Sequence, residues 1–237
     1  MKSIFLLILI LLYSSQQIKA QRSRDYFSIG MGPSIIYGDN TANYPMHDYK
    51  INPSLSLGYN EQLSHHLDIR ATIGFQTLNS GNKVYHQEDD VLAKAVEWGL
   101  AGQAKDFLGV ATYIDVMPGY NFRPVLSNMV GYPWLYYVGA GVGVMHVNRN
   151  DKIVIGINED REAAYVIREE RRSTTAVYFP LRAGISTNLE KDYDIGVEFS
   201  ALVTTGSAID GNNIRQKLIG ADMLFQVQFI AKVYLNR

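Results

Sequence analysis

The last stretch of the chain alternates between apolar and polar side chains over residues 219–235. Its odd positions are all apolar: Ile219, Ala221, Met223, Phe225, Val227, Phe229, Ala231, Val233 and Leu235. Its even positions include Gly220, Asp222, Gln226, Gln228 and Lys232. Because successive side chains of a strand point to opposite faces, this pattern predicts a strand with one apolar and one polar face. Strands of soluble proteins have about five or six residues, whereas a strand that crosses a bilayer needs about 9–11. This segment is therefore long enough to span a membrane.

The first twenty residues are predicted to be a secretory signal peptide. Lys2 precedes an apolar run over residues 4–13, and polar residues then lead to Ala20. This order of regions indicates cleavage between Ala20 and Gln21. A membrane anchor is the alternative, but the run is far shorter than the roughly 20 residues that a spanning helix needs. We therefore expect one exported domain over residues 21–237.

The composition is compatible with a membrane barrel and excludes other classes of site. The mean hydropathy of −0.08 resembles that of a soluble protein, but polar lumen residues dilute the lipid-facing ones in a barrel too. Cysteine is absent, so no disulfide or thiolate metal site is available. Residues 1–20 contain Lys2 and Lys19 and no acid, so their removal leaves 20 basic and 23 acidic residues, a net charge of −3. This balance does not suggest nucleic acid as a partner.

Seven further segments read as strands, over residues 26–37, 51–62, 67–76, 110–122, 138–144, 179–188 and 193–203. Eight is the smallest common strand number of outer-membrane barrels. The short connections are 63–66, 123–133 and 189–192, and the long ones are 38–50, 79–107, 148–174 and 205–217. Short periplasmic turns and long extracellular loops alternate in this way. We predict an all-β fold: an eight-stranded antiparallel up-and-down transmembrane β-barrel with a filled polar lumen, in which the last strand pairs with the first.

The polar face of the strands carries charge of both signs. The predicted lumen residues are Asp68, Arg70, Asp115, Arg182, Glu198, Asp222 and Lys232. Eight strands enclose a space that side chains can just fill, and buried charges must be paired there. We therefore expect a structural ion-pair network; the alternative is a proton or ion pathway. A lipocalin-like soluble barrel would reverse the two faces, and the alternation alone does not exclude it.

Aromatic residues gather at one end of several predicted strands. The predicted interface aromatics at the periplasmic rim are Tyr26, Phe27, Tyr120, Phe122, Trp134, Tyr136, Tyr193 and Tyr234. Amphipathic rings favour the boundary between membrane and water. Aromatics are also common in strands of any kind, but their clustering at one end favours a membrane interface.

Two loops contain further patterns. Residues 91–105 contain Val91, Ala95 and Trp98 at helical spacing, which predicts a short helix over the barrel mouth. Residues 152–172 read as a protruding hairpin that ends in mixed charge. Its cationic side chains could bind lipopolysaccharide phosphates, or the charges could simply be solvated.

The histidines suggest no catalytic or metal site. His65 and His66 read as solvated turn residues, and the acidic segment that follows His86 lacks the ligand spacing of a calcium loop. A lipid A-modifying enzyme would need a nucleophile beside His146, and no serine is near it in sequence. We expect no enzyme activity, no metal and no cofactor.

The ordered segments also resemble a known family. Residues 36–39, 52–59, 67–70, 120–122, 132–135, 139–142, 179–184 and 194–198 are similar to small outer-membrane barrel proteins that include the PorG-type accessory subunit of the type IX secretion system. This resemblance implies a non-enzymatic barrel in the outer membrane of a Gram-negative bacterium. It further implies contact with outer-membrane lipid and lipopolysaccharide, and a periplasmic protein partner at the short turns. A surface barrel whose outer loops bind a ligand or host molecule is the alternative.

Overall fold

The computed structural model describes residues 25–41, 49–81, 90–123, 133–157, 165–189, 192–212 and 217–235. The predicted signal peptide, with its cleavage site at Ala20 and Gln21, lies outside the described residues, as does the acidic segment 86–89. None of the described residues belongs to a helix with the length and hydropathy needed to cross a membrane.

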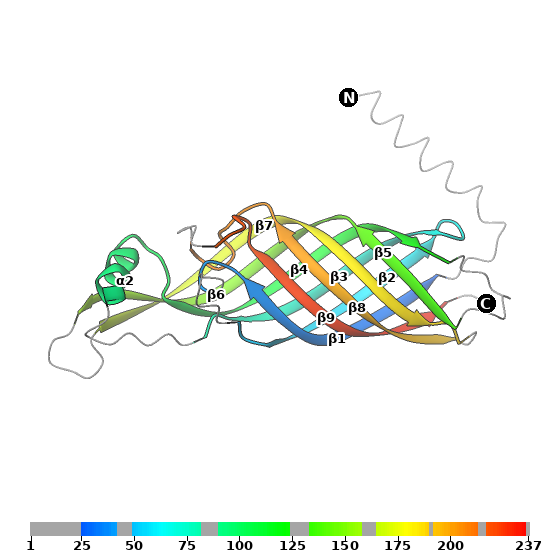
Figure 1. Ribbon diagram of the computed structural model, residues 1–237, viewed down its shortest axis with the longest axis horizontal. Helices are drawn as coiled ribbons and strands as arrows, with labels where there is room; N and C mark the ends of the chain where they lie inside the picture. The colour runs from blue at the N-terminus through cyan, green and yellow to red at the C-terminus, as the bar shows by residue number, and fades with distance from the viewer. Residues whose placement is uncertain are drawn as a thin grey trace, which may run out of the picture.

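The described strands form one closed antiparallel sheet (Figure 1). In chain order they are β1 (Tyr26–Tyr37), β2 (Asn52–Gln62), β3 (Leu67–Asn79), β4 (Asp106–Asn121), β5 (Trp134–Ala140), β6 (Val142–Ile157), β7 (Tyr165–Thr187), β8 (Tyr193–Thr204) and β9 (Met223–Tyr234). Neighbours in sequence pair with each other except β5 and β6, which both pair with β4 and β7. β9 pairs with β1 from Tyr26↔Tyr234 to Tyr37↔Met223. The predicted eight-stranded up-and-down barrel, with its first and last strands paired, is confirmed.

The nine strand segments form eight positions around the barrel, which we call staves. β5 and β6 lie end to end between β4 and β7 and form one stave, interrupted at Gly141. The opposite residue on β7 is Pro180, whose carbonyl accepts a hydrogen bond from the Gly141 N–H at 3.1 Å. Proline has no N–H to return this bond, so the ladder loses one link there. A side chain at 141 would also lie 2.2 Å from the carbonyl oxygen of Val116. Glycine therefore lets the stave continue past this point.

The last strand is shorter than predicted. The alternation begins at Ile219, but β9 begins at Met223. Lys217 pairs with Asp222, and the N–H of Asp222 donates to the carbonyl of Gly206 at 3.0 Å. These contacts bend residues 217–222 back toward β8, so Ile219 precedes the strand instead of starting it.

The predicted protruding hairpin is confirmed. β6 and β7 stay paired from Gly143↔Tyr178 to Ile157↔Tyr165, and their far part extends beyond the other staves (Figure 1). The predicted helix also forms, as α2 (Asp90–Leu100). It ends at Leu100, and the turn that follows contains Gly102, whose φ of 79° suits the left-handed residue found after many helices. It does not cover the barrel mouth as predicted, because Gly99 packs against the backbone of Val154 on the hairpin.

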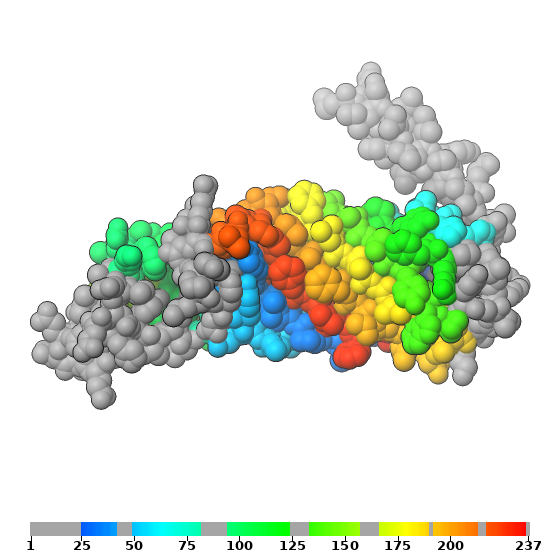
Figure 2. Space-filling view, in the orientation of Figure 1, coloured from blue at the N-terminus to red at the C-terminus, as the bar shows by residue number. Residues whose placement is uncertain are grey.

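The outer wall of the barrel is apolar and its interior is filled. The staves lie side by side in a continuous wall on the face shown in Figure 2. Each stave contributes exposed apolar side chains, which we call the apolar belt; one from each stave is Met31, Leu57, Ile73, Ile114, Val142, Phe179, Phe199 and Phe229. The short connections and the paired ends Tyr26 and Tyr234 share one end of the barrel. The hairpin and α2 lie at the other end, which we call the outer end.

Candidate functional site

All seven predicted lumen residues are buried. They are Asp68, Arg70, Asp115, Arg182, Glu198, Asp222 and Lys232, each at most 6% exposed. For the six that lie in strands, alternation explains this placement, because each is on the face opposite the apolar belt; Asp222 directly precedes β9. The structure distributes these residues over several separate groups.

Four of the seven residues form one ion-pair cluster in the middle of the barrel. The Arg182 guanidinium donates to both carboxylate oxygens of Asp115, at 2.7 and 2.6 Å. Its Nε lies 3.6 Å from Glu198 Oε1, and Arg70 pairs with the other oxygen of Glu198. The fork of an arginine fits a carboxylate in this bidentate way, so the charges are held in fixed geometry.

Tyrosine hydroxyls complete this cluster. Tyr178 donates to Asp115 Oδ2 at 2.5 Å, and Tyr137 donates to Glu198 Oε2 at 2.8 Å. Each carboxylate is thus bound by both an arginine and a tyrosine. Buried charge is tolerable when it is paired and hydrogen-bonded in this manner.

The other three predicted residues lie outside this cluster. Asp68 accepts a hydrogen bond from the Asn121 amide at 2.8 Å. The Lys232 ammonium donates to Ser186 Oγ at 2.9 Å and lies 5.0 and 4.5 Å from the ring centres of Tyr26 and Tyr137. Cation–π contact therefore takes the place of the ion pair predicted for Lys232. Asp222 belongs to a distinct group at the outer end.

Part of the interior is apolar, which departs from the prediction of a polar lumen. Buried side chains toward the outer end form a hydrophobic cluster that includes Ile36, Leu78, Phe107, Met145, Val147, Leu202 and Leu224. Tyr113 and Tyr178 belong to this cluster, and their rings meet edge to face with 6.2 Å between centroids. The apolar cluster and the ion pairs together fill the barrel, an arrangement that disfavours an open pore.

Charged residues from loops and from β4 and β6 are buried at the outer end. We call this set the outer charged cluster: Asp39, Lys105, Asp106, Arg149, Asp151, Asp210, Lys217 and Asp222, all buried. Ion pairs join Lys105 to Asp106 at 3.1 Å and Arg149 to Asp151 at 2.9 Å. Apart from Asp222, sequence reasoning missed these residues as site residues, because most of them lie in or beside loops where no periodicity reveals burial.

Asp210 is the most unusual member of the outer charged cluster. Its carboxylate accepts backbone N–H bonds from Asn40 at 3.1 Å and Asn212 at 2.9 Å, and it forms no ion pair with a described residue. Burial, followed by the nearby charge of Asp222, raises the pKa of Asp210 from 3.8 to about 8. This carboxyl group therefore holds a proton at neutral pH, while it ties the loop before β9 to the loop after β1.

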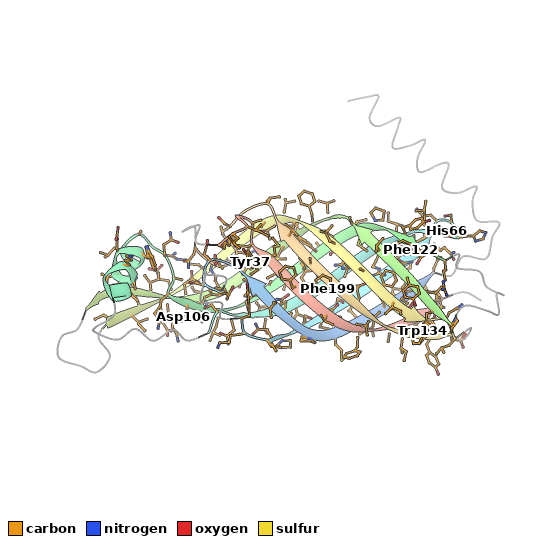
Figure 3. The ribbon with its side chains drawn as sticks, viewed as in Figure 1. Tyr37, His66, Asp106, Phe122, Trp134 and Phe199 are labelled. Atoms are coloured by element: carbon orange, nitrogen blue, oxygen red, sulfur yellow. The ribbon has the colours of Figure 1, made fainter. Side chains whose placement is uncertain are left out.

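Six of the eight predicted interface aromatics face outward near the end with the short connections. They are Phe27, Tyr120, Phe122, Trp134, Tyr136 and Tyr193, and Figure 3 labels Phe122 and Trp134 at this end. Tyr26 is buried instead, and its hydroxyl accepts a hydrogen bond from Arg70 at 3.2 Å. Tyr234 is half-buried and donates to Asp194 at 2.7 Å. Both side chains lie on the lumen side because they alternate with lipid-facing neighbours.

Among the described residues, no group of three or more histidine, aspartate or glutamate side chains is arranged to hold a metal ion. His66 Nδ1 lies 2.8 Å from the carbonyl oxygen of Asn121, and its ring stacks on Tyr120. His146 is exposed on the outer wall, where its Nδ1 lies 2.8 Å from Thr175 Oγ1. A histidine and a hydroxyl thus meet on the outer wall, and the hydroxyl belongs to a threonine.

No family model matches the chain, and no curated protein matches its sequence. Among solved structures it is similar to Neisserial surface protein A, with a TM-score of 0.51 and 8% identity over 89% of this chain and 97% of that one. The attachment invasion locus protein Ail of Yersinia pestis gives 0.47 and 13% over 91% and 99%. A major outer membrane protein from Thermus thermophilus gives 0.41 and 12% over 89% and 99%. At identities this low, structural similarity shows the fold alone. The similarity to Neisserial surface protein A shows that the chain has the fold of a small outer-membrane β-barrel.

Proposed function

We propose that this chain is a non-enzymatic integral protein of the outer membrane of a Gram-negative bacterium, and that it anchors or supports an envelope assembly. The observation that carries the membrane location is the apolar belt. Phe229, near the middle of β9, is 68% exposed, whereas the charges of the same strands are buried. A soluble protein would bury the apolar face, because apolar surface is driven out of water. Lipid is the solvent in which this distribution is stable.

A charged substitution on the belt tests this location. Arginine at the midplane of a membrane barrel costs about 2–4 kcal/mol, whereas on a water-exposed surface it costs little. We expect Phe229→Arg to lower the free energy of unfolding in lipid vesicles by that amount. The matched control is Ile167→Arg on the protruding hairpin, also exposed, which should be nearly neutral. Equal stability of the two variants would contradict the membrane location.

The filled interior supports a role that uses the rims of the barrel and not its lumen. The resemblance to the PorG-type family favours an accessory subunit of type IX protein secretion, with a periplasmic partner at the short turns. Because the chain has no cysteine, Ser64→Cys places a unique crosslinking site in the exposed turn between β2 and β3. Crosslinking there should recover a periplasmic partner, and the same experiment with Asn150→Cys, exposed on β6 toward the outer end, should not. Recovery of the barrel alone, with secretion intact in a deletion strain, would refute this role.

A second candidate is a surface barrel whose outer loops bind a ligand, a host molecule or lipopolysaccharide. The protruding hairpin favours it, because residues 165–173 of β7 extend past the barrel and carry several exposed side chains. Deletion of residues 152–172 should abolish such binding and leave the barrel folded. Unchanged binding after this deletion would reject the hairpin as the binding element.

A lipid A-modifying enzyme is the remote alternative, and it would use His146. Our proposal predicts that overexpression leaves lipid A unchanged. Altered lipid A that returns to normal in His146→Ala would establish the enzyme instead.

A further inference from the structure

The far part of β7 has a backbone edge without a described partner. β7 runs from Tyr165 to Thr187, but it pairs with β8 only from Tyr178 to Ser186. Over residues 165–176 the strand pairing among described residues is with β6 alone. In Figure 1 this part of β7 lies beyond the other staves, at the outer end. Among the described residues, one long edge of the hairpin thus has backbone groups that no strand pairs with.

Hydrogen bonds at both ends of the barrel identify the residues that supply these groups. The carbonyl of Val177 accepts the N–H of Thr205, on the β8 side, at 3.0 Å. The N–H of Asn188 donates to the carbonyl of Pro133, on the β5 side, at 2.9 Å. Successive residues of a strand direct their backbone groups to opposite edges. The open edge therefore consists of the N–H and C=O groups of the odd residues Ile167, Glu169, Arg171, Ser173 and Thr175.

The side chains of these odd residues point to one face of the ribbon, where Thr175 Oγ1 lies 2.8 Å from His146 Nδ1. All five are exposed, and Glu169 and Arg171 form no ion pair with another described residue. The opposite face of β7 is already occupied. There Glu170 pairs with Arg168 at 2.7 Å and with Arg172 at 2.6 Å. Arg172 also donates to the carbonyl of Gly102 at 2.6 Å, which fixes the hairpin to the loop after α2.

The position of α2 and the sequence of β7 leave the edge of β7 accessible to another strand. The contact between Gly99 and Val154 places α2 on β6, which leaves the edge of β7 clear of the helix. Residues 165–177 contain no proline, and the register shift of the hairpin lies on β6, between Val154 and Gly156. Two devices that block exposed edges, a proline and a bulge, are thus missing from the described part of this edge, whereas charged side chains are present. The charges of Glu169 and Arg171 point to one face of the ribbon, and those of Arg168, Glu170 and Arg172 to the other.

We propose that residues 167–175 dock an extended segment of a separate polypeptide as an additional antiparallel strand. Main-chain hydrogen bonds to the odd residues would provide the affinity, and alternate side chains the specificity. The incoming strand would carry an acidic residue opposite Arg171, a basic residue opposite Glu169 and an apolar residue opposite Ile167. This surface lies outside the apolar belt, so the proposal does not depend on the assembly role suggested above.

The test is binding of a fluorescent peptide of about ten residues with this complementary pattern, measured with the folded full chain in detergent. The Arg171→Pro variant removes one N–H from the open edge and none from the pairing with β6, and it should weaken binding about tenfold. Arg171→Ala keeps the N–H and should weaken binding less. A peptide with its acidic and basic residues exchanged should also bind about tenfold more weakly. No binding of the matched peptide, or equal binding by Arg171→Pro, would overturn the proposal.

Crosslinking provides a second measurement that leaves the backbone of the hairpin unchanged. Ser173→Cys on the open edge should form a disulfide with a peptide that carries cysteine at the facing position. Asn150→Cys is a matched control, because residue 150 is exposed on β6 of the same hairpin. Equal yields from the two positions would overturn the assignment to the β7 edge.

Discussion

Replacing Arg182 by methionine should remove the cation that two buried carboxylates share in the middle of the barrel. The guanidinium donates to both oxygens of Asp115 at 2.7 and 2.6 Å and lies 3.6 Å from Glu198. The side chains of Arg182 and Asp115 are 2% and 0% exposed, so water does not screen the charge that remains. Removing one partner of a buried ion pair costs about 3–5 kcal/mol. We expect Arg182→Met to lower the free energy of unfolding by this amount.

Urea unfolding of the full chain in lipid vesicles, followed by tryptophan fluorescence and gel mobility, measures this loss. The double variant Arg182→Met with Asp115→Asn should be more stable than the single variant, because one unpaired charge is removed. Arg171→Met makes the same change at an exposed position of the hairpin and should shift stability by less than about 0.5 kcal/mol. A loss below about 1 kcal/mol for Arg182→Met, or no recovery in the double variant, would refute the structural role of the ion-pair cluster.

Two further predictions concern the outer end and the glycines of the wall. Burial and the charge of Asp222 raise the pKa of Asp210 from 3.8 to about 8, so the folded state keeps a proton that the unfolded chain loses. Stability should therefore fall as pH rises from about 4 to about 8, and Asp210→Asn should flatten this part of the pH profile of the unfolding midpoint. A side chain at Gly184 would lie 2.3 Å from the ring of Tyr137, whereas nothing lies within 4 Å at Gly156. Gly184→Ala should lower the free energy of unfolding by about 1–3 kcal/mol, with little loss for Gly156→Ala; equal losses would contradict the packing described here.

The barrel could be predicted from the sequence because each stave repeats the same two-residue period. Lipid-facing positions such as Phe229 and lumen positions such as Gln228 alternate along the whole strand. The same rule identifies the two predicted interface aromatics whose side chains lie on the lumen side. Tyr26 directly precedes Phe27, so the two cannot face lipid together. Tyr234 likewise shares the even, lumen-facing positions of β9 with Lys232.

The partners of the lumen residues could not be predicted from the alternation. Asp222 directly precedes β9 and Lys232 lies near its other end, about 30 Å along the strand at the usual rise per residue, and they join different groups. The period gives the direction of a side chain but not its neighbours across the barrel. The burial of Lys217 and Asp210 left no signal either, because their loop has no period. Their burial results from the folded structure, which brings the ends of β1, β6 and β9 together around them.

The central claim, that this chain folds as a barrel in the outer membrane, is tested most directly by its gel mobility with and without boiling after cell fractionation. A folded membrane barrel remains intact in detergent at room temperature. We therefore expect the protein in the outer-membrane fraction, with one mobility when unboiled and a different one after boiling. Recovery as a soluble periplasmic protein, with the same mobility before and after boiling, would contradict the account.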